Sequence, residues 1–197
     1  MFVSLQLGQC ARNYRGCLMP DVRYPEGNMN INLRDSQDSD IPFLREMLYE
    51  AVFWRDSVNR PSFEEGLAYP DVGKSLADWG ERDGDTAVVA TLNSTPIGAS
   101  WYRFWTDDNY INGYIDDVTP VLVIAVHQDY RHQGIGGKMI DRLIDSATRH
   151  AIQEMSLSVS KDNYAMNLYV QQGFQEYADR GDAFIMVRRI QTGEFRA

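Results

Sequence analysis

The sequence is poor in residues that bind metals or form disulfides. It holds only two cysteines, Cys10 and Cys17, and three histidines among 197 residues. The cysteine spacing matches no four-ligand zinc pattern, and the nearest histidine along the chain is His127, so we expect no structural metal. So few cysteines make a reduced, cytoplasmic compartment the default expectation.

Long apolar runs are also absent from the sequence. No stretch approaches the roughly 18 to 20 apolar residues that a membrane-spanning helix needs. The N-terminal stretch MFVSLQLGQCARNYRGC opens on a short apolar segment with no basic leader before it, so we expect no signal peptide.

Positive charge is in short supply. Lys and Arg number 19 against 28 Asp and Glu, which gives a net charge of −9 and a pI near 4.8. This balance argues against non-specific binding to nucleic acid or to an anionic membrane, since both need a basic face. A negative field favours cationic small molecules or basic peptides as partners, although solubility accounts for it equally well.

The content that remains is that of an ordinary globular protein. Hydrophobic residues make up 44% and aromatic residues 12% of a chain long enough for one sizeable domain. Residues 1–28 show no clear periodicity and predict an N-terminal extension, whereas residues 29–197 predict one domain. The extension is interpreted either as an over-read start codon or as a segment that packs on a neighbouring subunit.

Periodicity predicts an α/β fold with one mixed sheet. A helix over 39–55 would have Ser39 as its N-cap and Pro42 in its first turn, and Gly173 would end a later short helix. The predicted helices cover 39–55, 62–68, 72–79, a segment from Gly134 to about Arg149, and 163–172. The predicted strands cover 30–36, 86–92, 97–105, 121–126, 155–160, 174–180 and 183–190, and 107–117 forms a polar loop.

The stretch VHQDYRHQGIGGKM, residues 126–139, places three glycines within four residues at the start of a helix. The dinucleotide fingerprint G-x-G-x-x-G would require glycine where Met139 stands. The ATP-binding P-loop would require glycine at His132 and Ser or Thr in place of Met139 after Lys138. The arrangement that remains is a strand, a charged turn, R-x-x-G-x-G and a helix.

This arrangement is suited to a diphosphate. A helix N-terminus presents unpaired N–H groups and the positive end of the helix dipole. Glycine lets oxyanions approach the backbone and permits the φ values of an anion-binding nest. Arg131, His132 and Lys138 could add charge or hydrogen bonds at the rim. The alternative is a glycine-rich helix start that binds no ligand.

Two motifs carry a resemblance to a known family. Arg131-x-x-Gly134-x-Gly136, after the strand VLVIAV, resembles the acyl-CoA-binding motif of the GNAT superfamily of N-acetyltransferases. The segment from Asn163 to Phe174 is similar to the superfamily's later N-x-x-x-x-L-Y-x-x-x-G-F segment, and the likeness spans Ile31 to Ile190. The resemblance implies a single domain whose mostly antiparallel mixed sheet splays between its fourth and fifth strands and is flanked by helices.

The resemblance also implies a cofactor site. The pantetheine arm of acetyl-CoA would pair with exposed backbone in the splay, with Ile124 and Val126 as the expected partners. Asn163 would lie near the pantetheine, or would simply cap the next helix. The diphosphate would lie on the N–H groups beyond Arg131, which belong to His132, Gln133, Gly134, Ile135, Gly136 and Gly137.

For the chemistry, the resemblance points to Tyr169 as the acid that protonates the leaving thiolate. The alternative is a half-buried tyrosine beside Leu168 and Phe174. Many relatives carry a glutamate at the start of the fourth strand, where this chain has Val121. Asp117, or its neighbour Asp116, could substitute as the base, although both could equally belong to a solvated loop.

The family forms its acceptor site between its first helices and two loops. Here those regions contain Trp54, Arg55, Tyr69, Trp79, Trp105 and Tyr110, which could hold a cationic amine or serve as core or dimer packing. The resulting hypothesis is direct acetyl transfer from acetyl-CoA to a primary amine, small molecule or peptide, in a ternary complex without metal, and a homodimer is possible. The alternative is a catalytically silent module that binds acyl-CoA, which Val121 keeps open.

Overall fold

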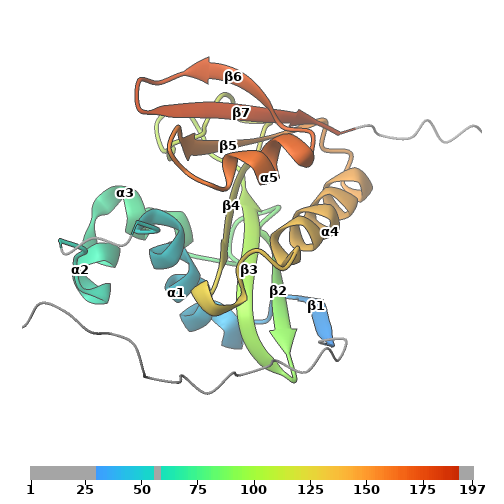
Figure 1. The fold of residues 1–197 in the computed structure, drawn as a ribbon. Coiled ribbons are helices and arrows are strands. Elements are labelled where there is room, and N and C mark those ends of the chain that lie inside the picture. The colour runs from blue at the N-terminus through green and yellow to red at the C-terminus, as the bar shows by residue number, and fades with distance from the viewer. Residues whose placement is uncertain (1–29, 56–58, 191–197) are drawn as a thin grey trace, which may run out of the picture.

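A computed structural model describes residues 30–55 and 59–190, so the expected extension 1–28 and both cysteines lie outside the described residues. Its seven-stranded sheet has the order β1-β2-β3-β4-β5-β7-β6 (Figure 1). All neighbouring strands are antiparallel except β4 and β5. The strands are β1 Ile31–Asp35, β2 Thr86–Leu92, β3 Thr95–Arg103, β4 Val121–Val126, β5 Glu154–Ser160, β6 Gln175–Asp179 and β7 Ala183–Arg189. The predicted mixed, mostly antiparallel sheet is confirmed.

Helices cover both faces of this sheet. Figure 1 shows α1 to the left and α4 to the right of the central strands. Because side chains alternate along a strand, β2 serves both layers: Val88 and Ala90 pack with α4, and Ala87 and Val89 pack with α1. The helices are α1 Ile41–Val52, α2 Phe63–Ala68, α3 Pro70–Gly73, α4 Ile135–Arg149 and α5 Met166–Gln171. Among the described residues, no helix is long and apolar enough to cross a membrane.

The start of α1 differs from the prediction. Asp40, not Ser39, is its N-cap residue, and a 3-10 turn over Asp38–Asp40 precedes the helix. The buried Asp40 carboxylate accepts hydrogen bonds from the Gln37 N–H at 2.8 Å and from Arg34 at 2.6 and 2.8 Å. The carboxylate makes no hydrogen bond to the first turn of α1, so it supports the 3-10 turn ahead of the helix and does not cap the helix itself.

The splay between β4 and β5 is confirmed. A single residue pair, Val121 and Ser156, joins the two parallel strands. The Ser156 N–H donates to the Pro120 carbonyl oxygen at 3.0 Å, and beyond this point β4 continues to Val126 without a partner strand on that side. The sheet is therefore closed at one end of β4 and open at the other.

The Arg34–Asp40 pair predicts a pH-dependent contribution to stability. The hydrogen bonds from Arg34 hold the pKa of Asp40 below its ordinary value, against the opposing effect of burial. The contribution is therefore fully present above about pH 4, the unfolded pKa of an aspartate. It is lost as the pH falls through the lower pKa of the folded state.

We expect Asp40→Asn to lower the free energy of unfolding by about 1 to 3 kcal/mol at pH 7, measured by chemical denaturation. The deficit should shrink as the pH falls below about 4. Asp38→Asn, in the same turn but exposed, is the control and should change stability by less than about 0.5 kcal/mol. A deficit for Asp40→Asn that does not vary with pH would contradict the assignment.

Candidate active site

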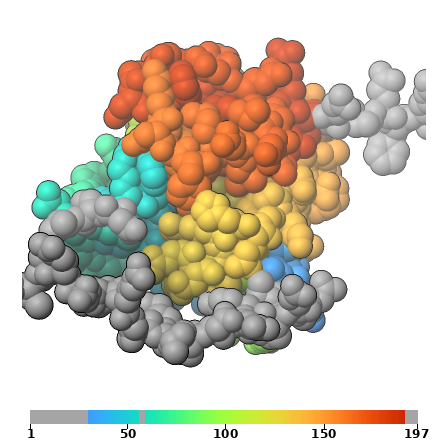
Figure 2. Space-filling model, viewed as in Figure 1, coloured from blue at the N-terminus to red at the C-terminus, as the bar shows by residue number. Residues whose placement is uncertain are grey.

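The open end of β4 lines a large cleft of about 760 Å³. Figure 1 shows β4 between the α1–α3 side of the molecule and the side of α4 and α5, and Figure 2 shows the yellow surface at the start of α4 meeting the orange surface of the C-terminal half. The lining residues are 48, 50–52, 54 and 55 in and after α1, 71, 72, 74 and 75 in and after α3, 108–112, 122–126 of β4, 158–160 of β5, 163–165, and 182–183. Arg131 and Tyr169 complete the lining.

The backbone of β4 faces this cleft at alternate residues. The His127 N–H donates to the Ile97 carbonyl at 2.9 Å, so the opposed pair Gly98 and Val126 is of the type that exchanges no hydrogen bonds. By the same alternation, the N–H and C=O groups of Ile124 and Val126 turn away from β3 and toward the splay. These are the two residues that the resemblance singled out, and their binding to pantetheine stays a prediction.

The N-terminus of α4 presents free N–H groups. Gly134 is its N-cap, with φ of 75°, and no side chain caps the helix. The first amide of the helix with a backbone partner is that of Lys138, which donates to the Gly134 carbonyl at 3.3 Å. His132 also has a positive φ, 61°, which costs a non-glycine residue about 1 to 2 kcal/mol. Strained backbone at uncapped amides is typical of an anion-binding turn.

Glycine stands at each of the three positions for a different structural reason. Gly134 needs its left-handed φ, and a Cβ there would meet no atom within 4 Å. A Cβ on Gly136 would lie 3.0 Å from the Leu168 side chain and 3.6 Å from that of Ile124, and a Cβ on Gly137 would lie 3.2 Å from Gln172. The second and third glycines therefore let α4 approach α5, which places the helix terminus beside β4.

Arg131 lies differently from the expected rim position. Its Nε donates to the Val126 carbonyl oxygen at 2.9 Å, and its guanidinium pairs with Glu50 of α1 at 3.0 Å. Glu50 also pairs with Arg60 at 2.7 Å. The Arg131 side chain thus connects the turn to α1, and of the three basic side chains expected at the rim only His132 and Lys138 stay exposed.

Asn163 lines the cleft and also supports the chain before α5. Its side-chain oxygen accepts from the Ala165 N–H at 2.9 Å, one residue position before the helix begins. The N-cap residue of α5 is Ala165, so Asn163 does not cap the helix as the alternative expected but supports the turn before it, and its amide nitrogen is left for a second partner. The next residue, Tyr164, lies against the His132 ring at 5.3 Å and the Trp54 ring at 6.0 Å.

Tyr169 lies on α5 and combines burial with access to the cleft. Its side chain is 8% exposed and packs edge-on against Phe174, with 6.0 Å between ring centroids. Burial raises the pKa of its hydroxyl well above the ordinary value of a phenol. The hydroxyl therefore stays protonated at neutral pH and can act as a proton donor. Both interpretations made from the sequence, packing and proton donation, are compatible with this position.

Asp117 does not share the cleft with Tyr169. It lines a separate cavity of about 400 Å³ with Arg82, Phe104 and Trp105, and it accepts a short hydrogen bond from the Tyr114 hydroxyl. That hydrogen bond raises the pKa of Tyr114 to about 12. Asp116, the other candidate base, accepts from the N–H groups of Val118 and Thr119 at 3.1 and 2.8 Å. Neither aspartate is among the residues that line the cleft.

The expected acceptor residues divide into two groups. Trp54, Arg55 and Tyr110 line the cleft, whereas Trp79 and Trp105 pack against Arg103, and Tyr69 packs on Phe53. Sequence reasoning missed the carboxylates that line the cleft, which are Glu50, Asp71, Asp108 and Asp182. No local motif marks them, because each comes from a different segment.

Comparisons with known proteins agree with this geometry. The family described as the Acetyltransferase (GNAT) family matches residues 48–174, more than half of the chain and both motifs. A comparison with curated proteins gives no match.

Several solved structures share the fold. PaiA N-acetyltransferase from Thermoplasma acidophilum, in complex with coenzyme A, has a TM-score of 0.58 at 19% identity over 82% of this chain and 99% of that chain. YncA, a putative acetyltransferase from Salmonella typhimurium with acetyl-CoA, has a TM-score of 0.56 at 21% identity over 85% and 96%. Ribosomal-protein-alanine N-acetyltransferase from Brucella melitensis has a TM-score of 0.58 at 19% identity over 80% and 99%. These likenesses concern the fold, whereas the matched family covers the glycine turn, β4 and Tyr169: the chain belongs to the acetyltransferase (GNAT) family.

Proposed function

We propose that this protein is an N-acetyltransferase that transfers the acetyl group of acetyl-CoA to a primary amine by direct transfer in a ternary complex. The observation that carries the proposal is the position of the uncapped N-terminus of α4. It lies beside the open backbone of β4, in a structure whose cleft also contains Tyr169.

The residues present fit two parts of acetyl-CoA that a binding site must recognise, which are the diphosphate and the pantetheine arm. The N–H groups from Gln133 to Gly137 suit a diphosphate, since the helix dipole adds to their hydrogen bonds. The N–H and C=O groups of Ile124 and the N–H of Val126 suit the peptide-like pantetheine, because an extended chain can pair with an open strand edge. The Val126 carbonyl oxygen already accepts from Arg131 Nε. The bound acetyl-CoA supplies an activated acyl group as a thioester.

The mechanism requires proximity and two proton transfers. Holding the amine and the thioester together converts a bimolecular reaction into one within a complex, which lowers the barrier. The Tyr169 hydroxyl is the proton donor to the departing sulfur, and its burial keeps that proton in place until it is needed. An incoming ammonium must also lose a proton before its nitrogen can attack.

The acceptor of that ammonium proton is a carboxylate of the cleft in this proposal, rather than Asp117. Asp108 extends from the loop that also carries Tyr110, and both line the cleft. Glu50 is already engaged by two guanidinium groups, and Asp71 pairs with Lys74 at 3.0 Å. Asp108 accepts one hydrogen bond, from the Thr106 hydroxyl, so it has oxygen lone pairs left for a water or an amine.

Thiol release from acetyl-CoA tests the function. The panel should include an alanine-terminated peptide, because one structural neighbour is a ribosomal-protein-alanine N-acetyltransferase. It should also include the polyamine spermidine. We expect release above the rate of hydrolysis with at least one amine, together with a rise in melting temperature on addition of CoA. A thermal shift without turnover would favour the silent acyl-CoA-binding module, and no thermal shift would contradict a CoA site.

The glycine turn gives a prediction with a matched control. Gly134→Ala should weaken CoA binding by about tenfold or more in calorimetry, because a Cβ disfavours the φ that orients the free amides. Gly80 has a similar φ, 87°, and the same open surroundings, but lies before β2 and not at the start of α4. Gly80→Ala should therefore lower the melting temperature comparably and leave CoA affinity unchanged. Equal affinity losses in both variants would indicate a general effect on folding.

Tyr169 gives a second prediction. Tyr169→Phe should lower kcat roughly 10²- to 10⁴-fold, the contribution of a general acid, with little change in CoA affinity. Tyr102→Phe is the control, since Tyr102 is equally buried in the same core and its hydroxyl has no hydrogen-bond partner in the described chain. That variant should keep the wild-type rate. A wild-type rate in Tyr169→Phe would remove Tyr169 from the role of acid.

Asp117 gives a third prediction. Asp117→Asn should lower the pKa of Tyr114 from about 12 toward 10, because the carboxylate holds the phenol protonated. Ultraviolet difference titration against wild type would show one tyrosine that ionises at a lower pH. The same variant should retain kcat within about twofold, because Asp117 faces the second cavity. A loss of kcat near that of Tyr169→Phe would restore Asp117 as the base.

A further inference from the structure

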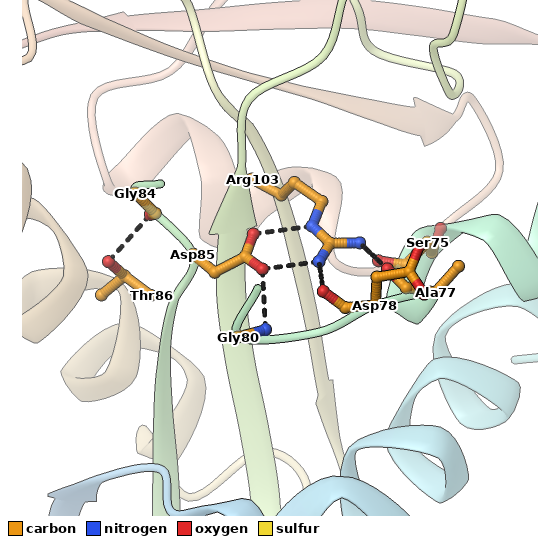
Figure 3. A network of polar contacts seen from close by, with 8 residues as sticks. All are labelled: Ser75, Ala77, Asp78, Gly80, Gly84, Asp85, Thr86 and Arg103. Atoms are coloured by element: carbon orange, nitrogen blue, oxygen red, sulfur yellow. Dashed lines mark hydrogen bonds and ion pairs between the residues drawn. The ribbon is translucent and has the colours of Figure 1, made fainter. Parts of the chain in front are cut away.

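A buried ion pair lies next to the cleft segment that ends at Ser75. Arg103, the last residue of β3, and Asp85, just before β2, have side chains that are 1% and 3% exposed. Arg103 Nε donates to one Asp85 oxygen at 2.6 Å and a terminal nitrogen donates to the other at 2.5 Å (Figure 3). The rings of Trp79 and Trp105 lie over the guanidinium at 5.0 and 5.9 Å.

The remaining donors of Arg103 all bind the backbone of one segment. They reach the carbonyl oxygens of Ala77 at 2.6 Å, Asp78 at 3.1 Å and Ser75 at 3.4 Å, as Figure 3 shows. All five N–H groups of the guanidinium are therefore used. On the carboxylate side, Asp85 also accepts from the Gly80 N–H at 2.9 Å. The pair thus binds the turn 75–80 at three carbonyls and one amide.

Stability alone is a weak reason to keep such a pair. Removing two charges from water is costly, and well-packed apolar residues often serve stability equally well. A planar guanidinium with five donors in fixed directions does what an apolar side chain cannot, which is to fix the positions of several carbonyl groups at once. The function of the pair should therefore be sought in the segment that it holds.

That segment forms part of the cleft wall. Asp71, Val72, Lys74 and Ser75 line the cleft, and the first of the three carbonyls that Arg103 binds is that of Ser75 itself. On the other side of Arg103, the chain continues into the loop whose residues 108–112 line the same cleft. The Lys74 ammonium lies 5.9 Å from the Tyr110 ring, so the two segments approach each other. Figure 1 shows α3 and α4 on opposite sides of β4.

We propose that Arg103 and Asp85 are positioning residues that fix the acceptor wall of the cleft, formed by 71–75 and 108–112, and thereby determine which amine the enzyme accepts. The inference rests on the proposed acetyltransferase function. Neither side chain reaches the cleft surface, so both act through the backbone that they hold. The glycine turn belongs to another segment, and β4 meets the pair at Val121, which is opposite Arg103 in the sheet, whereas Ile124 and Val126 lie further along the strand.

The test measures the effect on the amine substrate separately from the effect on CoA. Arg103→Lys keeps the charge but lacks the planar fork, and Asp85→Asn keeps the shape but loses the charge. With whichever of the alanine-terminated peptide and spermidine is acetylated, both variants should raise KM for the amine by about tenfold or more. Their preference between the two amines should change, while the Kd of CoA by calorimetry stays within about twofold of wild type.

The Arg34–Asp40 pair is the matched control. It is also a two-oxygen, guanidinium–carboxylate pair, but it joins β1 to the start of α1, and neither residue lines the cleft. Arg34→Lys and Asp40→Asn should lower the melting temperature without changing the KM of the amine or the preference between amines. Gly80→Ala, which disturbs only the amide bound to Asp85, gives a milder variant in case the Arg103 and Asp85 variants do not fold.

A second readout needs no acceptor. Amide hydrogen exchange of residues 70–80 should accelerate in Arg103→Lys and in Gly80→Ala, while exchange of α4 stays at the wild-type rate. Unchanged exchange in 70–80, or amine KM values no higher than in the Arg34 and Asp40 variants, would overturn the inference. These outcomes differ from failure of the proposed function, which would appear as absence of a CoA thermal shift or of acetyl transfer in the wild-type protein.

Discussion

The architecture of the site depends on one constraint, which is that β4 pairs with β5 at a single position. The bridge between Val121 and Ser156 closes one end of the sheet, and divergence beyond it leaves the backbone groups of Ile124 and Val126 facing a cleft instead of a strand. Backbone groups in a sheet normally find partners within it. A strand edge left open in the middle of a seven-stranded sheet is therefore a place where an extended, amide-containing ligand can bind, and the structure brings a helix terminus and Tyr169 to the same place.

Each wall of this cleft is positioned by a different kind of interaction. On the α4 side, Gly136 and Gly137 let α4 and α5 pack closely, so steric fit positions this wall. Between the two sides, Glu50 of α1 pairs with Arg131 of the glycine turn, which joins the first helix to the turn by charge. On the α3 side, Arg103 binds three carbonyls of one turn. The α4 side and the α3 side of the cleft therefore have separate supports.

Much of the fold could be predicted from the sequence because its signals are local. Alternation and β-branched runs gave the strands to within a few residues, and the R-x-x-G-x-G turn gave the start of α4. What could not be predicted depends on which partner each side chain meets in the folded protein. Arg131 turns toward Glu50, 81 residues earlier, and Asp117 turns toward Tyr114 and a second cavity. Ser39 matched a capping preference, but Asp40 gained a charged partner from β1, which no local rule contains. The carboxylates of the cleft were missed for the same reason.

The central claim is that the open edge of β4 and the N-terminus of α4 together form the acyl-CoA site. Residue-resolved amide hydrogen exchange, with and without saturating CoA, tests it most directly. The account predicts slower exchange at Ile124, Val126 and the amides from Gln133 to Gly137 when CoA is bound, with no change along β7. CoA that binds without protecting these amides, or that protects them no more than the rest of the sheet, would contradict it.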